Sequence, residues 1–379
     1  MISDARERQI NVSPPAAFES PRVQKESRMD SIFLVGGFAP ERLEASYRRA
    51  FQAIGIRTET LDMRYASCQL SGLVRNRIGN RLTMRSTLSR KLLSRSFNRH
   101  LETAVLQSKA PVLLLFKGEF VMPETIHALR QKGVRVACFY PDNPFPPHSC
   151  NRPEALPAAR ETDLYLVWSE LLVRQLKDAG VSNPVFLPFA WDPIVFPFEE
   201  VQPPGSWPGA LFLGGWDKER EELLEELACH VPLRIYGPGY WGTRTRLRSR
   251  VRECWQGTAL LMADAARKIR ESAVCINPLR KQHTIDGKPD GLIMRHFEVP
   301  GAGGFLLSTR SGGATNLFPE GETGEYFSDV AECIEKAKFY IANDSARRQL
   351  AERAHGAVAA YHQYTDRARQ IVKLLEEIR

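Results

Sequence analysis

A carboxylate beside a run of glycines is the first pattern in this sequence that can do chemistry. Glu298 lies in the segment RHFEVPGAGG, ahead of Gly301, Gly303 and Gly304. A carboxylate that accepts hydrogen bonds from two vicinal hydroxyls forms charge-assisted bonds, and glycine lets a ligand approach the backbone closely because it has no Cβ. Both features suit a nucleoside. The alternative is a Glu298 that caps a helix or pairs with Arg295 on its surface.

Three cations in the same stretch suit a diphosphate. Arg280, Lys281 and Arg295 all lie within residues 277–308. A departing nucleoside diphosphate needs cations or helix N-termini, because negative charge develops on the phosphate as the bond breaks. We therefore expect Arg295 to bind phosphate. Arg280 and Lys281 are each equally consistent with a solvated pair in a loop.

Two glycine pairs each follow a short apolar run. Gly214 and Gly215 follow GALFL, with Lys218 nearby, and form a second candidate phosphate loop. Gly36 and Gly37 follow SIFLV and can pack against a diphosphate or against a second substrate, the acceptor. A bare glycine pair is weak evidence, and a tight turn between a strand and a helix explains Gly36 and Gly37 equally well.

Polar residues follow two further apolar runs in the first half of the chain. Lys117 and Glu119 follow one run and Asp142 follows the next. Strand ends of this kind line the ligand side of an open α/β domain, here the acceptor side. Asp142 or Glu119 can then position or deprotonate an acceptor hydroxyl. Both can instead cap the turns in which they lie.

A basic segment covers residues 75–99. No Asp or Glu occurs between Arg64 and Leu101, and apolar residues recur at helical spacing among the cations. The cations are Arg75, Arg77, Arg81, Arg85, Arg90, Lys91, Arg95 and Arg99. Such an amphipathic helix can dock on an anionic membrane surface or bind an anionic glycan, or it can be a core helix with one solvated face.

The overall composition narrows the classes of protein. The net charge of +8 and the pI near 9.2 favour an anionic partner. The seven cysteines and eight histidines show no metal-binding spacing, so we expect reduced thiols and no metal cofactor. No segment resembles a membrane span, a secretory signal, a nucleophile elbow or a Walker loop. These observations favour a cytoplasmic protein and argue against hydrolase, P-loop and oxidoreductase functions.

The elements that must position these residues alternate along the chain. Continuous apolar runs, typical of strands in a parallel sheet covered on both faces, alternate with helical patterns. In the first half the runs are 31–35, 110–116, 134–140, 163–168 and 184–189; in the second they are 209–215, 232–237, 272–278 and 303–308. The sequence therefore predicts an α/β protein.

A proline-rich stretch, residues 188–209, interrupts the alternation and predicts a linker. We expect a flexible tail over 1–29, a Rossmann-like acceptor domain over 30–190, and a linker over 191–208. A second Rossmann-like, nucleotide-binding domain then covers 209–360. A C-terminal helix covers 361–379 and can cross back to the first domain. Parallel sheets of two such domains face each other across a cleft.

The segment around Glu298 also resembles a known family. Arg295, Phe297, Glu298 and GAGGFLLS are similar to the C-terminal motif of the spore-maturation CgeB-type glycosyltransferases, within the wider retaining GT-B group. The resemblance extends over residues 184–375. It implies two carboxylates separated by seven residues, the second on the donor ribose and the first facing the sugar. Glu298 takes the second position and Asp290 the first, where the family has Glu.

The resemblance implies a hexosyltransferase-like enzyme of the GT-B fold. It would transfer a sugar, with retention, from a nucleotide-sugar to a hydroxyl of a glycan or lipid-linked acceptor, without a cofactor. The composition predicts a cytoplasmic protein, and the basic segment over residues 75–99 could place it at the inner face of the membrane. The alternative is a non-catalytic GT-B-like module that binds nucleotide or glycan in cell-surface polysaccharide assembly. Nucleic acid is a less favoured partner, because no RNA-binding motif or aromatic platform accompanies the charge.

Overall fold

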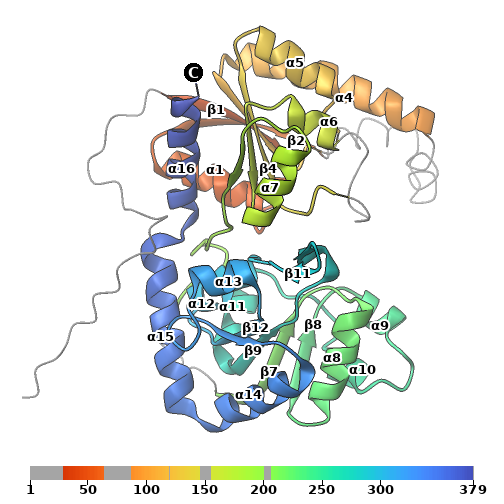
Figure 1. Cartoon of the computed structure of the whole chain (residues 1–379), viewed down its shortest axis with the longest axis vertical. Helices are drawn as coiled ribbons and strands as arrows, with labels where there is room; N and C mark the ends of the chain where they lie inside the picture. The colour runs from red at the N-terminus through yellow and green to blue at the C-terminus, as the bar shows by residue number, and fades with distance from the viewer. Residues whose placement is uncertain (1–28, 64–86, 119, 146–154, 200–205, 379) are drawn as a thin grey trace, which may run out of the picture.

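The chain folds into two α/β domains, one above the other in Figure 1. The computed structural model describes residues 29–63, 87–118, 120–145, 155–199 and 206–378. Each domain contains one parallel sheet flanked by helices, and the second domain also has a short antiparallel hairpin. The predicted α/β class with two Rossmann-like domains is therefore confirmed.

The first domain contains a six-stranded sheet in the order β2-β1-β3-β4-β5-β6, and every pairing is parallel. The strands are β1 (Ser31–Gly36), β2 (Arg57–Asp62), β3 (Val112–Phe116), β4 (Arg135–Tyr140), β5 (Leu164–Val167) and β6 (Pro184–Phe186). The five predicted apolar runs form β1 and β3 to β6. Strand β2, RTETLD, was not predicted, because it lies at the sheet edge and is mostly exposed and polar.

Helices cover both faces of this sheet. They are α1 (Leu43–Ala53), α4 (Thr87–Ser108), α5 (Pro123–Gln131), α6 (Ala155–Arg160) and α7 (Glu170–Asp178). Only residues 87–99 of the predicted basic helix are described, and they belong to α4. Phe97 and Leu101 are buried in the core, whereas Arg95 and Arg99 are exposed. The described part of α4 thus packs on the domain with a solvated face.

The second domain contains a five-stranded parallel sheet in the order β13-β12-β9-β7-β8. Its strands are β7 (Trp207–Leu213), β8 (Leu233–Tyr236), β9 (Ser272–Asn277), β12 (Leu306–Thr309) and β13 (Glu325–Phe327), and the hairpin is β10 (Thr284–Ile285) with β11 (Lys288–Pro289). Its helices are α8 (Lys218–Ala228), α9 (Tyr240–Arg244), α10 (Arg250–Cys254), α11 (Met262–Glu271), α12 (Arg295–Gly301), α13 (Gly312–Leu317), α14 (Val330–Ala342) and α15 (Asp344–Tyr361).

The last helix, α16 (Tyr364–Glu377), returns to the first domain and packs against α1 (Figure 1). The ring centroids of Tyr47 and Tyr364 lie 5.0 Å apart, in an edge-to-face contact. Arg367 is fully buried and donates to the carbonyl of Pro188 at 3.0 Å. The two crossings of the chain between domains lie side by side, because the N–H of Trp191 donates to the carbonyl of His362 at 2.8 Å.

Candidate functional site

Three arginines converge where strands β7 and β9 end in the second domain. Arg280 follows β9, Arg295 is the first residue of α12, and Arg220 lies in the first turn of α8. The Nε of Arg295 donates to the carbonyl of Leu213, the last residue of β7, at 3.3 Å. Because the carboxyl ends of parallel strands form the ligand-binding edge of such domains, this arginine cluster lies where a ligand is expected.

Arg220 is the buried member of the cluster, with 6% of its surface exposed. Asp217 caps α8 by accepting a hydrogen bond from the N–H of Arg220 at 2.9 Å. The Arg220 guanidinium points back to the strand ends, where Nε donates to the carbonyl of Pro278 at 3.0 Å and Nη1 to that of Gly215 at 3.2 Å. It also lies over the ring of Phe212. These contacts fix the guanidinium in one position.

The guanidinium groups of Arg280 and Arg295 are close enough to Arg220 to disfavour its charge. Burial, and then the charges of Arg280 and Arg295, lower the pKa of Arg220 to about 9 although Asp217 raises it. Burial also lowers the pKa of Arg295 to about 10. Both groups stay charged at neutral pH. An anion bound between these arginines would reduce the repulsion between their positive charges, so the cluster can bind a phosphate group.

Two carboxylates partly compensate this positive charge. Asp217 lies 3.1 Å from the Nε of Arg280, and Glu298 forms an ion pair with Nη1 of Arg295. The pairing of Glu298 with Arg295 was the alternative interpretation of the sequence. It is not a surface pair, however, because Glu298 is only 4% exposed. A ligand anion on Arg295 would compete with Glu298 for its guanidinium.

Asp290 joins the two domains. Its carboxylate accepts a hydrogen bond from the hydroxyl of Ser169, which caps α7 in the first domain, and another from the N–H of Gly313 at 3.1 Å. Nearby, the rings of Trp168 and His283 are in edge-to-face contact, with their centroids 5.6 Å apart. The segments that follow β5 and β9 are therefore in contact, and the carboxyl edges of the two sheets face each other.

The glycines after Glu298 are surrounded by protein side chains. A Cβ on Gly301 would lie 2.3 Å from Trp191, and one on Gly304 would lie 2.3 Å from Ile269. Gly303 has a φ of +82° at the C-terminal end of α12, where a left-handed residue ends the helix. The close approach that these glycines permit is thus made by the protein itself, at the end of α12 opposite Arg295.

The two predicted lysines lie on the surface outside the cluster. Lys218 is 79% exposed and 3.7 Å from Glu222. Lys281 is 82% exposed and 2.6 Å from Glu219. The structure thus brings together Gly215, Arg280, Arg295 and Glu298 among the predicted donor residues, and adds Arg220, which was not predicted from the sequence. Asp217 was the available signal, because a helix cap there places Arg220 in the first turn of α8, and helical side chains point toward the N-terminus of their helix, here toward the glycine pair.

The glycine pair of the first domain has a different environment. A Cβ on Gly36 would lie 2.5 Å from Cγ of Glu44, and the N–H of Gly37 donates to the Glu44 carboxylate at 3.2 Å. Burial raises the pKa of Glu44, although its hydrogen bonds and Arg42 lower it. The turn therefore encloses an acid of α1.

Lys117 and Asp142 form an ion pair of 2.8 Å at the carboxyl ends of β3 and β4. Lys117 has a φ of +63°, which is unusual for a residue with a Cβ. Glu119 lies outside the described residues.

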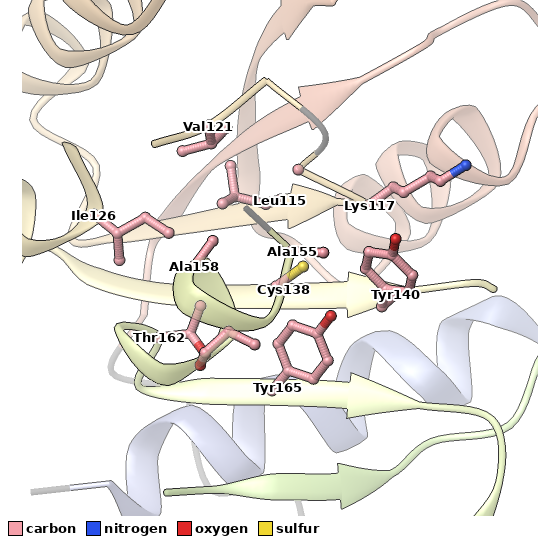
Figure 2. Close-up of a pocket in the computed structure, with 12 residues that line it drawn as sticks. Leu115, Lys117, Val121, Ile126, Cys138, Tyr140, Ala155, Ala158, Thr162 and Tyr165 are labelled. Atoms are coloured by element: carbon pink, nitrogen blue, oxygen red, sulfur yellow. The ribbon is translucent and has the colours of Figure 1, made fainter. Parts of the chain in front are cut away.

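A small cavity lies behind this ion pair, between β3 to β5 and α6. Its volume of about 20 Å³ holds one water molecule. Figure 2 shows Lys117 and Tyr140 at one end and Thr162 and Tyr165 below Cys138. The hydroxyl of Tyr165 is buried without a hydrogen-bond partner, so an internal water molecule is expected there.

Among the described residues, no group of three His, Cys, Asp or Glu side chains is placed to hold a metal ion. Within the same ranges, no helix has the length and apolar character needed to span a membrane.

The second domain is similar to a known family. Residues 219–373 match the family model described as "Glycosyl transferase-like", a range that begins beside Arg220 and includes Arg280, Arg295 and Glu298. Comparison with curated protein sequences finds no match.

Solved structures with the same fold cover nearly the whole chain. Sucrose-phosphate synthase from Thermosynechococcus elongatus is 13% identical with a TM-score of 0.64, over 92% of this chain and 98% of that one. A glycosyltransferase from Rickettsia africae is 11% identical with a TM-score of 0.63, over 93% and 99%. Anabaena HepE in complex with UDP and glucose is 13% identical with a TM-score of 0.58, over 92% and 99%. At these identities the likeness concerns the fold: this chain has the GT-B fold, and its second domain is similar to the glycosyl transferase-like family.

Proposed function

We propose that this protein transfers a glycosyl group from a nucleotide-sugar to a hydroxyl of a glycan or lipid-linked acceptor. The observation that carries the proposal is the arginine cluster of Arg220, Arg280 and Arg295 at the carboxyl edge of the second sheet. A diphosphate bound there neutralises guanidinium groups that otherwise repel one another, and the same groups stabilise the charge that develops as the diphosphate departs. The complex of HepE with UDP and glucose makes UDP the first nucleotide to test.

Glu298 is assigned to the ribose of the donor. In the free protein its carboxylate is engaged by Arg295. A diphosphate that draws Arg295 toward its oxygens leaves the Glu298 carboxylate able to accept the two ribose hydroxyls. Binding of the diphosphate and of the ribose are then coupled through this ion pair. Gly214 and Gly215 border the same site. The roles of Lys218 and Lys281 in donor binding rest on their charge and their place in the sequence, and those of Gly301 to Gly304 on the family resemblance and on their missing Cβ.

Asp290 is assigned to the sugar end of the donor, and transfer proceeds with retention of configuration. Its carboxylate lies between the two domains, on Ser169 and Gly313. A sugar held there would face the first domain, where Asp142 or Glu119 positions or deprotonates the acceptor hydroxyl. In the free protein Lys117 neutralises Asp142. Under this assignment the Lys117–Asp142 ion pair of 2.8 Å belongs to the part of the first domain that binds the acceptor, as does the turn at Gly36 and Gly37.

The proposed setting is the cytoplasmic face of a membrane, with residues 75–99 on its anionic surface. Arg95 and Arg99, the described and exposed cations of this segment, support the proposal. Residues 75–86 lie outside the described residues.

A thermal-shift panel of nucleoside diphosphates and nucleotide-sugars tests the proposal first. A ligand at 100 times its dissociation constant stabilises the folded state by about 2.7 kcal/mol. The stabilising nucleotide-sugars are then offered with glycan and lipid-linked acceptors, and glycosidic product is measured. Stabilisation without sugar transfer identifies the non-catalytic binding module instead, and no stabilisation by any nucleotide contradicts the donor site.

A further inference from the structure

An exposed basic loop projects from the second domain between β8 and α10. Leu247 at its tip is 85% exposed, and Tyr240 at the start of α9 is 55% exposed. Five arginines occur in residues 240–252, with no acidic residue among them: Arg244, Arg246, Arg248, Arg250 and Arg252. We call residues 246–248, Arg-Leu-Arg, the arginine–leucine tip. Figure 1 shows α9 and α10 at the outer edge of the second domain, on the same side as the start of α4.

The tip is held in place from both ends. Thr245 and Ser249 on either side of it are buried. The Glu221 carboxylate of α8 accepts from the N–H and from the Nε of Arg246, at 3.1 Å and 3.2 Å. One turn further along α8, Glu225 accepts from the hydroxyl of Ser249 and from the N–H of Arg250. The exposure of Leu247 is therefore a property of an anchored loop.

The loop is also joined to the glycine pair of the arginine cluster. Nε1 of Trp241 donates to the carbonyl of Gly214 at 2.9 Å. Trp216, which follows the glycine pair, donates to Glu221 at 2.7 Å and lies against the guanidinium of Arg244. Two indole hydrogen bonds thus connect the loop and its anchor Glu221 with the residues around the glycine pair.

We propose that the arginine–leucine tip docks the second domain on an anionic phospholipid surface. Arg248 is the main cation attracted to lipid phosphates, because Arg246 is already paired with Glu221, and the single apolar side chain enters the interfacial region. A protein partner would need a larger apolar patch than one leucine. A single-stranded nucleic acid would need aromatic faces on which successive bases stack, whereas the Tyr240 ring already has Arg244 over it, with Cζ 4.4 Å from the ring centre. The proposal does not depend on sugar transfer.

Vesicle binding of the full chain tests this surface. The protein is sedimented with vesicles of phosphatidylcholine alone and of phosphatidylcholine mixed with phosphatidylglycerol. We expect binding to the mixed vesicles only, weakened by salt. Combining Leu247→Ser with Arg248→Glu should lower the partition coefficient by roughly ten-fold or more, because each surface cation contributes separately.

The matched control combines Leu261→Ser with Arg174→Glu, an exposed leucine and an exposed arginine elsewhere on the surface. It should bind vesicles like the wild type. Thermal unfolding of both variants checks that they are folded. Equal binding to neutral and anionic vesicles, no binding to either, or wild-type binding by the tip variant each overturns the proposal. So does a tip variant that loses only oligonucleotide binding, or vesicle binding that is lost only when Arg95 and Arg99 are reversed.

Discussion

The two domains contain the same local pattern, a strand followed by a glycine pair and a helix. The helix side chain that contacts the glycine pair is an acid in the first domain and an arginine in the second. In the first domain Glu44 of α1 reaches back and accepts from the N–H of Gly37. In the second domain Arg220 of α8 reaches back and donates to the carbonyl of Gly215. We therefore expect the first turn to repel a diphosphate and the second to attract one. The side chain behind the glycines, more than the glycines themselves, decides which turn can bind an anion.

The largest expected effect is on the buried cation of the second turn. Arg220→Met keeps the aliphatic stem but removes the charge and both hydrogen bonds to the strand ends. Loss of a buried, hydrogen-bonded charge costs about 2 to 5 kcal/mol of binding free energy, so nucleoside diphosphate affinity should fall roughly thirty-fold or more. Calorimetry measures this. Glu44→Gln, which changes the acid beside the first turn, is the matched control and should bind the nucleoside diphosphate like the wild type. An equal loss of affinity in both variants would show that the two turns do not differ in anion binding.

The next effect separates the two ends of the nucleotide. Arg295→Ala should weaken nucleoside diphosphate binding by about 1.5 to 3 kcal/mol, the range for hydrogen bonds to charged groups, and leave free nucleoside binding nearly unchanged. Glu298→Gln should weaken the nucleoside diphosphate and the nucleotide-sugar by about ten-fold each. It should weaken the free nucleoside less, because Arg295 still engages Glu298 when no diphosphate is bound. Calorimetric titration of both variants with the three ligands measures the pattern. A folded Glu298→Gln protein that binds all three normally contradicts the ribose assignment.

Adding a methyl group to the glycine turns should lower stability in the first domain and nucleotide affinity in the second. In Gly36→Ala the new Cβ meets Cγ of Glu44 at 2.5 Å, close to the helix backbone, so overpacking should cost about 1 to 3 kcal/mol of stability. In Gly215→Ala it meets Nη2 of Arg280 at 2.5 Å, the far end of a flexible side chain. Stability should change little there, and nucleotide affinity should fall. Denaturant unfolding and calorimetry of both variants check this; the reverse outcome would place the anion site in the first domain.

The smallest effect concerns the acid of the first turn. Burial raises the folded-state pKa of Glu44, so the folded state binds this proton more tightly than the unfolded state does. The resulting stability is present below the unfolded pKa and is lost as pH rises through the folded pKa. Relative to Glu44→Gln, the wild type should therefore lose unfolding free energy as pH rises through the folded pKa of Glu44, above the ordinary value of 4.5. Denaturant unfolding across this range measures it, and parallel pH profiles would show that the carboxylate is not destabilised by burial.

The sequence predicted most of the sheets because their strands are buried on both faces. Run 110–116, for example, supplies β3, whose five residues are all buried. The polar edge strand β2 lacks this signal. The C-terminal helix expected over 361–379 corresponds to α16, which begins at Tyr364 after a break at His362 and Gln363 that ends α15. The chain turns there to rejoin Trp191.

The candidate site was harder to predict, because its contacts join distant parts of the sequence. Arg220 looks like a solvent-exposed member of the acidic helix KEREELLEELA, and only its contact with Pro278, 58 residues away, reveals a buried cation. Gly301 was expected to approach a ligand, but its partner is Trp191. Arg280 and Arg295 could be proposed as phosphate-binding residues from the sequence, because both occur within 20 residues of Glu298.

The structure of a complex with a nucleoside diphosphate would show directly whether the arginine cluster binds the donor. We expect a diphosphate within hydrogen-bonding distance of the guanidinium groups of Arg280 and Arg295, with the ribose on the carboxylate of Glu298 and the Arg295–Glu298 ion pair opened. A diphosphate bound instead at Gly36 and Gly37 of the first domain, with that ion pair intact, would contradict this expectation.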